Sequence, residues 1–264
     1  MKHLCYCFLF LSCVLSSFLQ AQETPVFEKA AFQHQGKTLP YRILKPVDFD
    51  ASKQYPLHIF LHGAGERGDD NEAQLVHGSN LFIQKNADFP AILIFPQCPQ
   101  EDYWAQRIYS RDEVNNENVF IFPKSKIEPT WAMSAVIALL ESQLQHDYID
   151  KNRIYLSGLS MGGMGTFELL SRKPDVFAAA TPICGGGNIG DVSIWGKQVP
   201  VWIFHGDQDG VVPARYSQTI VEALIKEDIE PRFSLYKGVG HNSWDNAFAE
   251  PDLFSWIYSN HKKN

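Results

Sequence analysis

Apolar and polar residues form a repeating block pattern along this chain from residue 26 onward. Short runs rich in β-branched and aromatic residues are typical of strands, and they alternate with segments that have the apolar spacing of helices. The expected strands are residues 27–34, 39–44, 56–61, 91–95, 153–156, 177–182, 200–205 and 232–237. The later runs are continuously apolar, which indicates burial on both faces. The pattern predicts an α/β fold with a mostly parallel central sheet and helices on both faces.

Helical spacing is found in residues 131–144, 160–172, 214–226 and 251–261. The stretch 100–130 has no clear periodicity and carries aromatic residues among polar ones. We interpret it as a long loop without regular structure. Loops of that length in a compact domain are usually functional or disordered, and the aromatic content favours a wall of a binding site.

Size and charge are those of one acidic globular domain. The 264 residues are 45% hydrophobic and 20% charged, enough for one sizeable core and too few for two comfortable domains. The formal net charge is -7, and no run of Lys and Arg longer than a pair interrupts the acidic balance. We therefore expect no nucleic-acid partner.

The N-terminus has the pattern of a cleavable secretory signal. Residues 1–3 include a lysine, residues 4–19 are largely apolar, and Ala21 offers a small residue for cleavage. We expect residues 1–21 to be a signal peptide and residues 22–264 to be a single domain, secreted or periplasmic. The apolar run is shorter than the roughly 20 residues of a spanning helix, so we expect no stable membrane anchor.

A nucleophile motif lies where an expected strand meets an expected helix. Residues 158–162 read G-L-S-M-G and follow the strand that ends at Leu156. In such a turn the serine takes a strained conformation that exposes its hydroxyl, and the flanking glycines avoid collisions with the neighbouring strand and helix. The bare pattern is weak evidence, but its place between strand and helix is specific. We expect Ser160 to be a catalytic nucleophile.

A serine nucleophile needs a base and an acid that orients the base. His241 follows the last expected strand, and Asp207 and Asp209 follow the strand before it. The carboxyl ends of strands hold the sites of open α/β sheets, and the chain order is Ser, Asp, His. An acid farther from its strand has the better reach toward the histidine, which favours Asp209. We interpret Asp207 as a turn residue whose carboxylate accepts backbone N–H groups.

Two backbone N–H groups are expected to bind the carbonyl oxygen of a substrate in an oxyanion hole. One is that of Met161 at the start of the nucleophile helix, where the helix dipole adds to the hydrogen bond. The other is that of Ala64, in the small-residue turn after the strand that ends at Leu61. His62 and His205 each precede a glycine at a strand end, and we interpret both as structural hydrogen-bonding residues.

Together the motifs resemble those of secreted esterases in the dienelactone-hydrolase and prolyl-oligopeptidase-like branch of the α/β-hydrolases, over about residues 39 to 258. The matching segments are H-G-A-G-E-R-G at 62–68, P-Q-C-P at 96–99, residues 150–153, S-M-G-G at 160–163, Asp209 with Val212-Pro213, and Gly240-His241 with Trp244. The resemblance implies the α/β-hydrolase fold and hydrolysis of carboxylic esters, often acetyl or feruloyl groups on plant polysaccharides. It implies no metal and no organic cofactor, and it places the acid three residues ahead of the Val-Pro pair, at Asp209.

Three aromatic residues are candidates for substrate contact: Trp104, Tyr109 and Trp244. Aromatic rings stack on sugar and aryl rings, although packing in the core is the alternative for each. Arg67 lies in a charged run that is usually a solvated face. Asp209 follows Ser160 by 49 positions, which leaves no room for a large lid domain, so we expect a site open to a bulky ester.

Three functions fit these residues. The favoured one is a serine esterase that acts through an acyl-enzyme on acyl groups of polysaccharides or on small aryl esters. A serine peptidase of the prolyl-oligopeptidase type has the same triad, but the roughly 30 residues before the first core strands cannot form the extra domain that limits access in such peptidases. A catalytically inactive binding protein is disfavoured because every expected catalytic position is filled. No Cys or His spacing matches a metal site.

Overall fold

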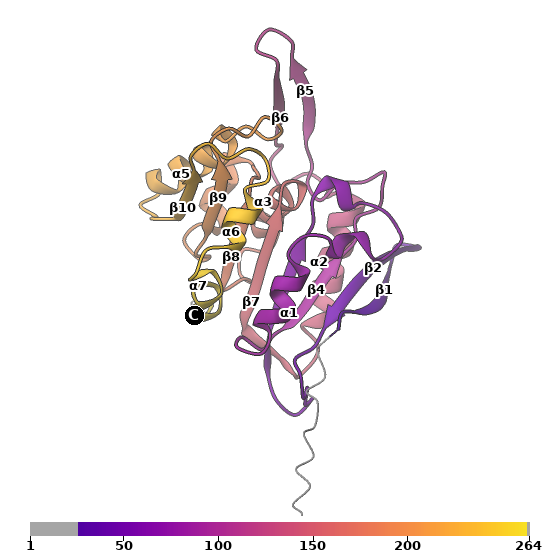
Figure 1. The fold of residues 1–264 in the computed structure, drawn as a ribbon. Coiled ribbons are helices and arrows are strands. Elements are labelled where there is room, and N and C mark those ends of the chain that lie inside the picture. The colour runs from indigo at the N-terminus through magenta and orange to yellow at the C-terminus, as the bar shows by residue number, and fades with distance from the viewer. Residues whose placement is uncertain (1–25, 263–264) are drawn as a thin grey trace, which may run out of the picture.

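The computed structural model describes residues 26–262, which form an eight-stranded sheet covered by helices (Figure 1). The strand order is β1-β2-β4-β3-β7-β8-β9-β10. These strands are β1 (Glu28–His34), β2 (Lys37–Leu44), β3 (Tyr55–Leu61), β4 (Ile92–Pro96), β7 (Ile149–Leu159), β8 (Ala179–Ile183), β9 (Trp202–Gly206) and β10 (Arg232–Tyr236). β2 is antiparallel to β1 and to β4, and the other neighbouring strands are parallel. The predicted mostly parallel sheet is confirmed.

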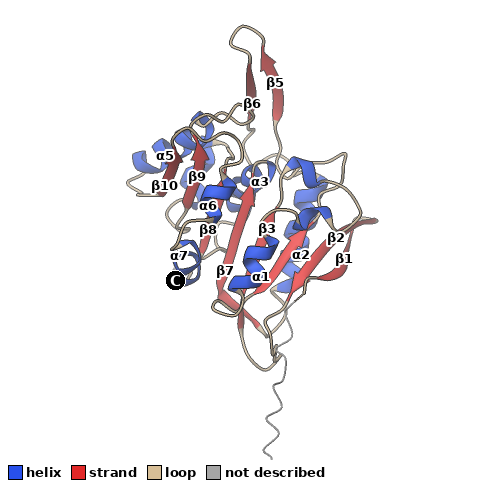
Figure 2. Ribbon diagram, viewed as in Figure 1, coloured by secondary structure: helices blue, strands red, loops and turns tan. Residues whose placement is uncertain are grey.

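Helices cover both faces of the sheet, as predicted (Figure 2). α2 (Trp131–Gln143), α3 (Met161–Arg172), α4 (Val192–Trp195) and α5 (Arg215–Lys226) contribute to the core on one face. α1 (Ser79–Lys85), α6 (Trp244–Phe248) and α7 (Leu253–Ser259) contribute to the core on the other. Neighbouring strand residues enter different cores, as Ile59 and Phe60 do. This double burial explains the continuously apolar strand sequences.

The expectation that residues 100–130 form a loop without regular structure is wrong in part. The segment contains a two-stranded hairpin, β5 (Ile108–Asp112) and β6 (Glu117–Ile121), which projects from the body of the molecule (Figure 1). Its side chains are largely exposed, so burial does not impose an apolar alternation on them. Near its base the Phe120 N–H donates to the Tyr216 hydroxyl at 2.7 Å. Near its tip Glu117, which pairs with Asp112 beside the turn, forms a salt bridge with Arg215 at 2.5 Å.

The expected signal peptide, residues 1–21, lies outside the described residues. Within residues 26–262, every helix is too short or too polar to cross a bilayer. Between β8 and β9 the chain forms only the 3₁₀ turn η3 (Ile189–Asp191) and the short helix α4, so this connection contains no large lid.

Candidate active site

Ser160 lies in a sharp turn between β7 and α3, with φ 54° and ψ -114°. This region of backbone space is costly for a residue with a side chain, and such strain is typical of functional sites. The adjacent glycines are needed because the chain is crowded there. A Cβ on Gly158 would lie 2.3 Å from the Gly162 carbonyl oxygen, and a Cβ on Gly162 would lie 1.8 Å from that of Leu61. The turn therefore holds the Ser160 hydroxyl at the carboxyl edge of the sheet.

Three side chains from separate loops meet at this edge. The Ser160 Oγ lies 2.8 Å from His241 Nε2, and His241 Nδ1 lies 2.7 Å from Asp209 Oδ2. Ser160 follows β7, Asp209 follows β9 and His241 follows β10. The structure thus brings the three residues expected to act together into one hydrogen-bonded chain, the arrangement that a hydroxyl nucleophile, its base and an orienting acid require.

Asp209 is almost fully buried, yet its environment favours the ionised carboxylate. Oδ1 accepts the N–H groups of Val211 at 2.8 Å and Val212 at 2.9 Å. Oδ2 accepts from His241, and His205 Nε2 lies 3.2 Å away. Burial by itself raises the pKa of Asp209, but the hydrogen bonds from His205 and His241 outweigh it and hold the pKa well below its ordinary value.

This ionisation determines the proton arrangement on the imidazole. An ionised carboxylate only accepts hydrogen bonds, so His241 Nδ1 carries the proton that faces Asp209. In a neutral imidazole the other nitrogen is then an acceptor, and the Ser160 hydroxyl donates to it at 2.8 Å. The site is arranged to remove the proton of the serine hydroxyl.

The residues interpreted as structural all have internal partners. His205 is fully buried, with Nδ1 2.7 Å from Ser217 Oγ and Nε2 2.8 Å from the Val212 carbonyl. His62 Nε2 accepts the Cys98 N–H at 2.9 Å. Burial lowers the pKa of His62 to about 4, which keeps the ring neutral at neutral pH.

Asp207, the alternative acid, bonds a backbone N–H of the loop that leads to His241, whereas Asp209 bonds the imidazole itself. Its Oδ1 accepts the Gly238 N–H at 2.7 Å, which is the turn role expected for it. The two aspartates therefore have separate partners, although they stand two positions apart.

The two expected oxyanion donors begin helical turns that lie next to each other. Met161 is the first residue of α3, and Ala64 is the first residue of the 3₁₀ turn η1 (Ala64–Glu66). N–H groups at the start of a helix have no acceptor within it, so they remain available to a substrate oxygen. The close approach of Gly162 to the Leu61 and His62 carbonyls brings the start of α3 against the turn that precedes Ala64.

Arg67 is not simply part of a solvated charged face, which corrects the expectation from its charged neighbours. Its Nε donates to the Ala64 carbonyl at 2.9 Å, and its Nη1 donates to the carbonyls of Gln100 at 3.0 Å and Asp102 at 3.3 Å. The guanidinium therefore ties the turn of a proposed oxyanion donor to the loop after β4. The charged run around Arg67 could not predict this linking role, because the partners of the guanidinium are backbone carbonyls, which every residue has.

The three candidate aromatic residues have different surroundings. Trp104 is fully buried and its Nε1 donates to the His62 carbonyl at 3.1 Å, so the expected substrate contact is wrong for this residue. Tyr109 is 50% exposed on the projecting hairpin. Trp244 packs edge-on against His241, with ring centroids 5.5 Å apart, and borders the site directly.

A cysteine lies behind this triad of Ser160, His241 and Asp209. Ligand-capable atoms of Cys184, Asp209 and His241 lie within 4.8 Å of one another. The thiol is fully buried, and burial raises the pKa of Cys184, which keeps it protonated although metal binding needs the thiolate. Asp209 and His241 are already bonded to each other. The donor set therefore fits the hydrogen-bonded triad better than a metal site.

Comparison with known proteins gives the family. The family described as phospholipase/carboxylesterase matches residues 46–255 of the chain. The chain belongs to this family. The match covers the strands that carry Ser160, Asp209 and His241, and it confirms the resemblance to α/β-hydrolase esterases.

Individual relatives of this phospholipase/carboxylesterase family member agree with that assignment. A curated relative, a bifunctional acetylxylan esterase/xylanase from Neocallimastix patriciarum, is 37% identical over 91 residues, 34% of this chain and 13% of the relative. The crystal structure of a thermostable esterase is 32% identical with a TM-score of 0.78, over 89% of this chain and 63% of that one. The chain thus spans only part of both proteins.

A ferulic acid esterase from Anaeromyces mucronatus, solved in complex with ferulic acid, has a TM-score of 0.62 at 16% identity. The superposition covers 91% of this chain and 92% of that one. At this identity the likeness shows the shared fold alone.

Proposed function

We propose that this protein is a serine esterase that hydrolyses carboxylic esters through an acyl-enzyme. The observation that carries the proposal is the unbroken chain of hydrogen bonds from Ser160 Oγ through His241 to the ionised Asp209. The Ser160 oxygen attacks the ester carbonyl while His241 Nε2 takes its proton, and Asp209 orients and stabilises the imidazolium. The N–H groups of Met161 and Ala64 stabilise the negative oxygen of the tetrahedral intermediate.

Collapse of this intermediate breaks the bond to the alcohol, which leaves with the proton held by His241. The acyl group then remains on Ser160. A water molecule attacks this second ester with His241 again as the base, and the acid product leaves with restoration of the serine hydroxyl. Every proton transfer in both halves of the cycle uses His241 Nε2, the atom 2.8 Å from the nucleophile.

For the substrate, we propose an acyl group linked to a polysaccharide, with small aryl esters also accepted. Support comes from the acetylxylan esterase activity in the name of the curated relative and from the short connection between β8 and β9. The signal-like pattern of residues 1–21 supports secretion, and a secreted enzyme has access to polysaccharides outside the cytoplasm.

Labelling with a fluorophosphonate probe tests the nucleophile. We expect stoichiometric labelling of the wild-type chain and none of Ser160→Ala, which also loses turnover by several powers of ten because the nucleophile is absent. Ser193→Ala, at an exposed position outside the site, is the matched control and should label normally. Labelling of Ser160→Ala would contradict the assignment, and so would loss of wild-type activity in EDTA.

Substrate preference separates the esterase from the peptidase. We expect hydrolysis of 4-nitrophenyl acetate and methyl ferulate, with little cleavage of a proline-containing amide. The opposite order of rates would identify the peptidase.

A further inference from the structure

A cavity of about 580 Å³ lies beyond β4, away from the triad. Its walls are the β1–β2 hairpin, the loops that follow β3 and β4, and the first residue of α2. This volume falls in the usual range for small-molecule sites. The esterase mechanism uses none of the side chains that line it.

The cavity opens at the same edge of the sheet as the active site. β2 runs antiparallel to β4 and pairs Tyr41 with Pro96, so the start of β2 lies at the carboxyl end of β4. Both loops in the wall also leave the carboxyl ends of their strands. β2 stands three strands from β7 in the sheet, which is roughly 14 Å at the usual strand spacing. A ligand that reaches from Ser160 to the cavity must therefore be an extended chain.

The lining has the groups that recognise a sugar. Trp131 provides a large, partly exposed aromatic ring, fixed by its Nε1, which donates to the His34 carbonyl at 3.3 Å. Asp69 and Glu101 are exposed carboxylates, and among the described residues neither has a hydrogen bond or salt bridge. Carboxylates accept hydrogen bonds from hydroxyl groups, and an aromatic ring packs against the apolar face of a sugar ring. Lys37 lies 5.5 Å from the Trp131 ring centroid and is a donor at the rim.

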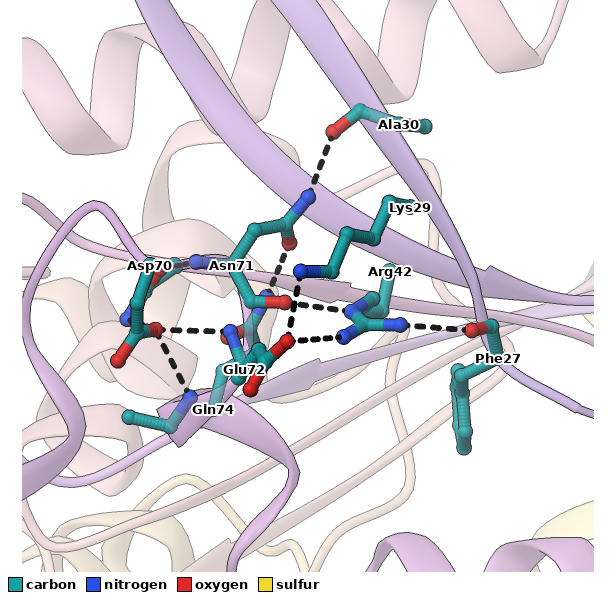
Figure 3. A network of polar contacts seen from close by, with 10 residues as sticks. Phe27, Lys29, Ala30, Arg42, Asp70, Asn71, Glu72 and Gln74 are labelled. Atoms are coloured by element: carbon teal, nitrogen blue, oxygen red, sulfur yellow. Dashed lines mark hydrogen bonds and ion pairs between the residues drawn. The ribbon is translucent and has the colours of Figure 1, made fainter.

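One wall is held in place by a dense polar network (Figure 3). Asn71 Nδ2 donates to the Ala30 carbonyl at 3.1 Å, which joins the loop after β3 to β1. The Asn71 N–H donates to Gln97 Oε1 at 2.7 Å, and Arg42 Nε donates to the Asn71 carbonyl. Gln74 Nε2 donates to Asn71 Oδ1 at 2.6 Å. A wall with these bonds already made is preorganised, so little conformational freedom is lost on binding.

The same loops connect the cavity to the active site. Arg67 bonds the Ala64 carbonyl in the turn of the proposed oxyanion donor and the Gln100 carbonyl in the loop that lines the cavity. We propose that this cavity is an accessory subsite that binds a neutral sugar unit of the same polysaccharide chain whose esterified unit lies at Ser160. The inference rests on the proposed polysaccharide esterase function and extends it to the unesterified part of the substrate.

Calorimetric titration of Ser160→Ala with unesterified xylohexaose tests the subsite without any need for hydrolysis. We expect measurable binding that weakens by about tenfold when Trp131→Ala is added, a change of about 1.4 kcal/mol. Trp131→Phe should retain most of the affinity, because it keeps an aromatic face. Asp69→Asn with Glu101→Gln should weaken binding several-fold without touching the core, and Glu222→Gln on the exposed face of α5 is the matched control.

Two results would overturn the subsite. The first is that Ser160→Ala does not bind xylohexaose. The second is that its affinity stays the same when Trp131→Ala is added and also when the two acid changes are added. The melting temperature of each variant shows whether it is folded. In the active enzyme, Trp131→Ala should raise KM for acetylated xylan more than it lowers kcat. If xylohexaose binds but the wild-type enzyme hydrolyses no ester, the subsite stands and the proposed esterase function fails. If the wild-type enzyme hydrolyses esters but Ser160→Ala does not bind xylohexaose, the proposed esterase function stands and the subsite fails.

Discussion

At the residue scale, the position of Asp209 depends on a close approach of two loops. Gly206 ends β9, and a Cβ there would lie 2.3 Å from the Val239 carbonyl in the loop that leads to His241. The loops after β9 and β10 can therefore touch, and Asp209 reaches the imidazole while Asp207 stays with Gly238. Two chemically identical side chains thus receive different partners.

Asp209→Asn should lower turnover by about 10⁴, the size of the loss when the equivalent acid of a serine protease becomes an amide, because the amide favours the wrong histidine tautomer. The melting temperature should also fall. An amide nitrogen in place of Oδ2 would face the donors His241 and His205 without an acceptor. Steady-state turnover and thermal unfolding of the purified variant measure both effects.

Asp207→Asn is the matched control for that change. Its Oδ1 bonds one backbone N–H, so the substitution should cost about 1 kcal/mol of stability and leave turnover within about a factor of ten. A catalytically dead Asp207→Asn beside a nearly normal Asp209→Asn would reverse the assignment of the acid.

Glycines near the site should differ sharply in tolerance. Gly162→Ala should prevent correct folding of the elbow, because its Cβ would lie 1.8 Å from the Leu61 carbonyl oxygen. Gly65→Ala should be nearly neutral, because a Cβ there would have no atom within 4 Å. Soluble yield, melting temperature and esterase activity of the two variants test the pair, and equal behaviour would show that the crowding at Gly162 is relieved by movement of the chain.

At the element scale, hydrogen bonds from Arg67 link the η1 turn to the loop that follows β4. Three backbone carbonyls accept from Arg67, one in η1 and two after β4. The guanidinium is thus a clamp between η1 and the loop after β4. A clamp of this kind positions a backbone donor without touching the substrate.

Arg67→Ala should lower kcat for 4-nitrophenyl acetate by about tenfold, the equivalent of about 1.4 kcal/mol, with little change in KM, since the role proposed for the Ala64 N–H is to stabilise the transition state. Arg111→Ala is the control, because Arg111 bonds only within the exposed β5–β6 hairpin. A rise in KM with constant kcat would instead indicate that Arg67 binds substrate directly.

At the scale of the whole molecule, a polar ladder crosses the core. His58 on β3 has Nε2 2.7 Å from Ser157 Oγ on β7 and Nδ1 3.1 Å from the Tyr258 hydroxyl on α7. Ser157 Oγ is in turn 2.5 Å from Thr181 Oγ1 on β8. Burial lowers the pKa of His58 to about 3, so its ring is neutral inside the folded protein.

Stability should therefore fall as the pH falls below about 6.5, the ordinary histidine value. There the unfolded chain binds protons at His58 and His62, whereas the folded protein resists protonation until a pH of about 3 and about 4. Each histidine should contribute about 1.4 kcal/mol of lost stability per pH unit within its window, and neither should contribute above it. Free energies of urea unfolding between pH 8 and pH 5 measure the slope.

His58→Phe tests the origin of that slope. The variant should be less stable at pH 7, because Ser157 and Tyr258 lose a partner, but its stability should depend on pH by about one proton less. An unchanged slope would exclude His58 as a source of the acid sensitivity.

The sequence by itself determined the fold class and the candidate chemistry. Strands buried on both faces must be continuously apolar, and a strand-to-helix serine turn needs glycines, so local pattern carried both conclusions. The pattern failed where side chains are not selected by burial. The hairpin within residues 100–130 projects into solvent, and the short helices α1, α4 and α6 have too few turns for a clear period.

Only the tertiary structure decided which like residues take which role. Trp104 and Trp244 are both tryptophans in predicted site segments, yet one is buried in the core and the other packs against His241. The sequence predicts that Arg67 is a solvated charge, and only the structure shows that it donates to backbone carbonyls. These outcomes depend on contacts between segments far apart in the chain. Nearly every residue has the same backbone groups, so a contact with backbone atoms does not restrict which residue type stands at that position.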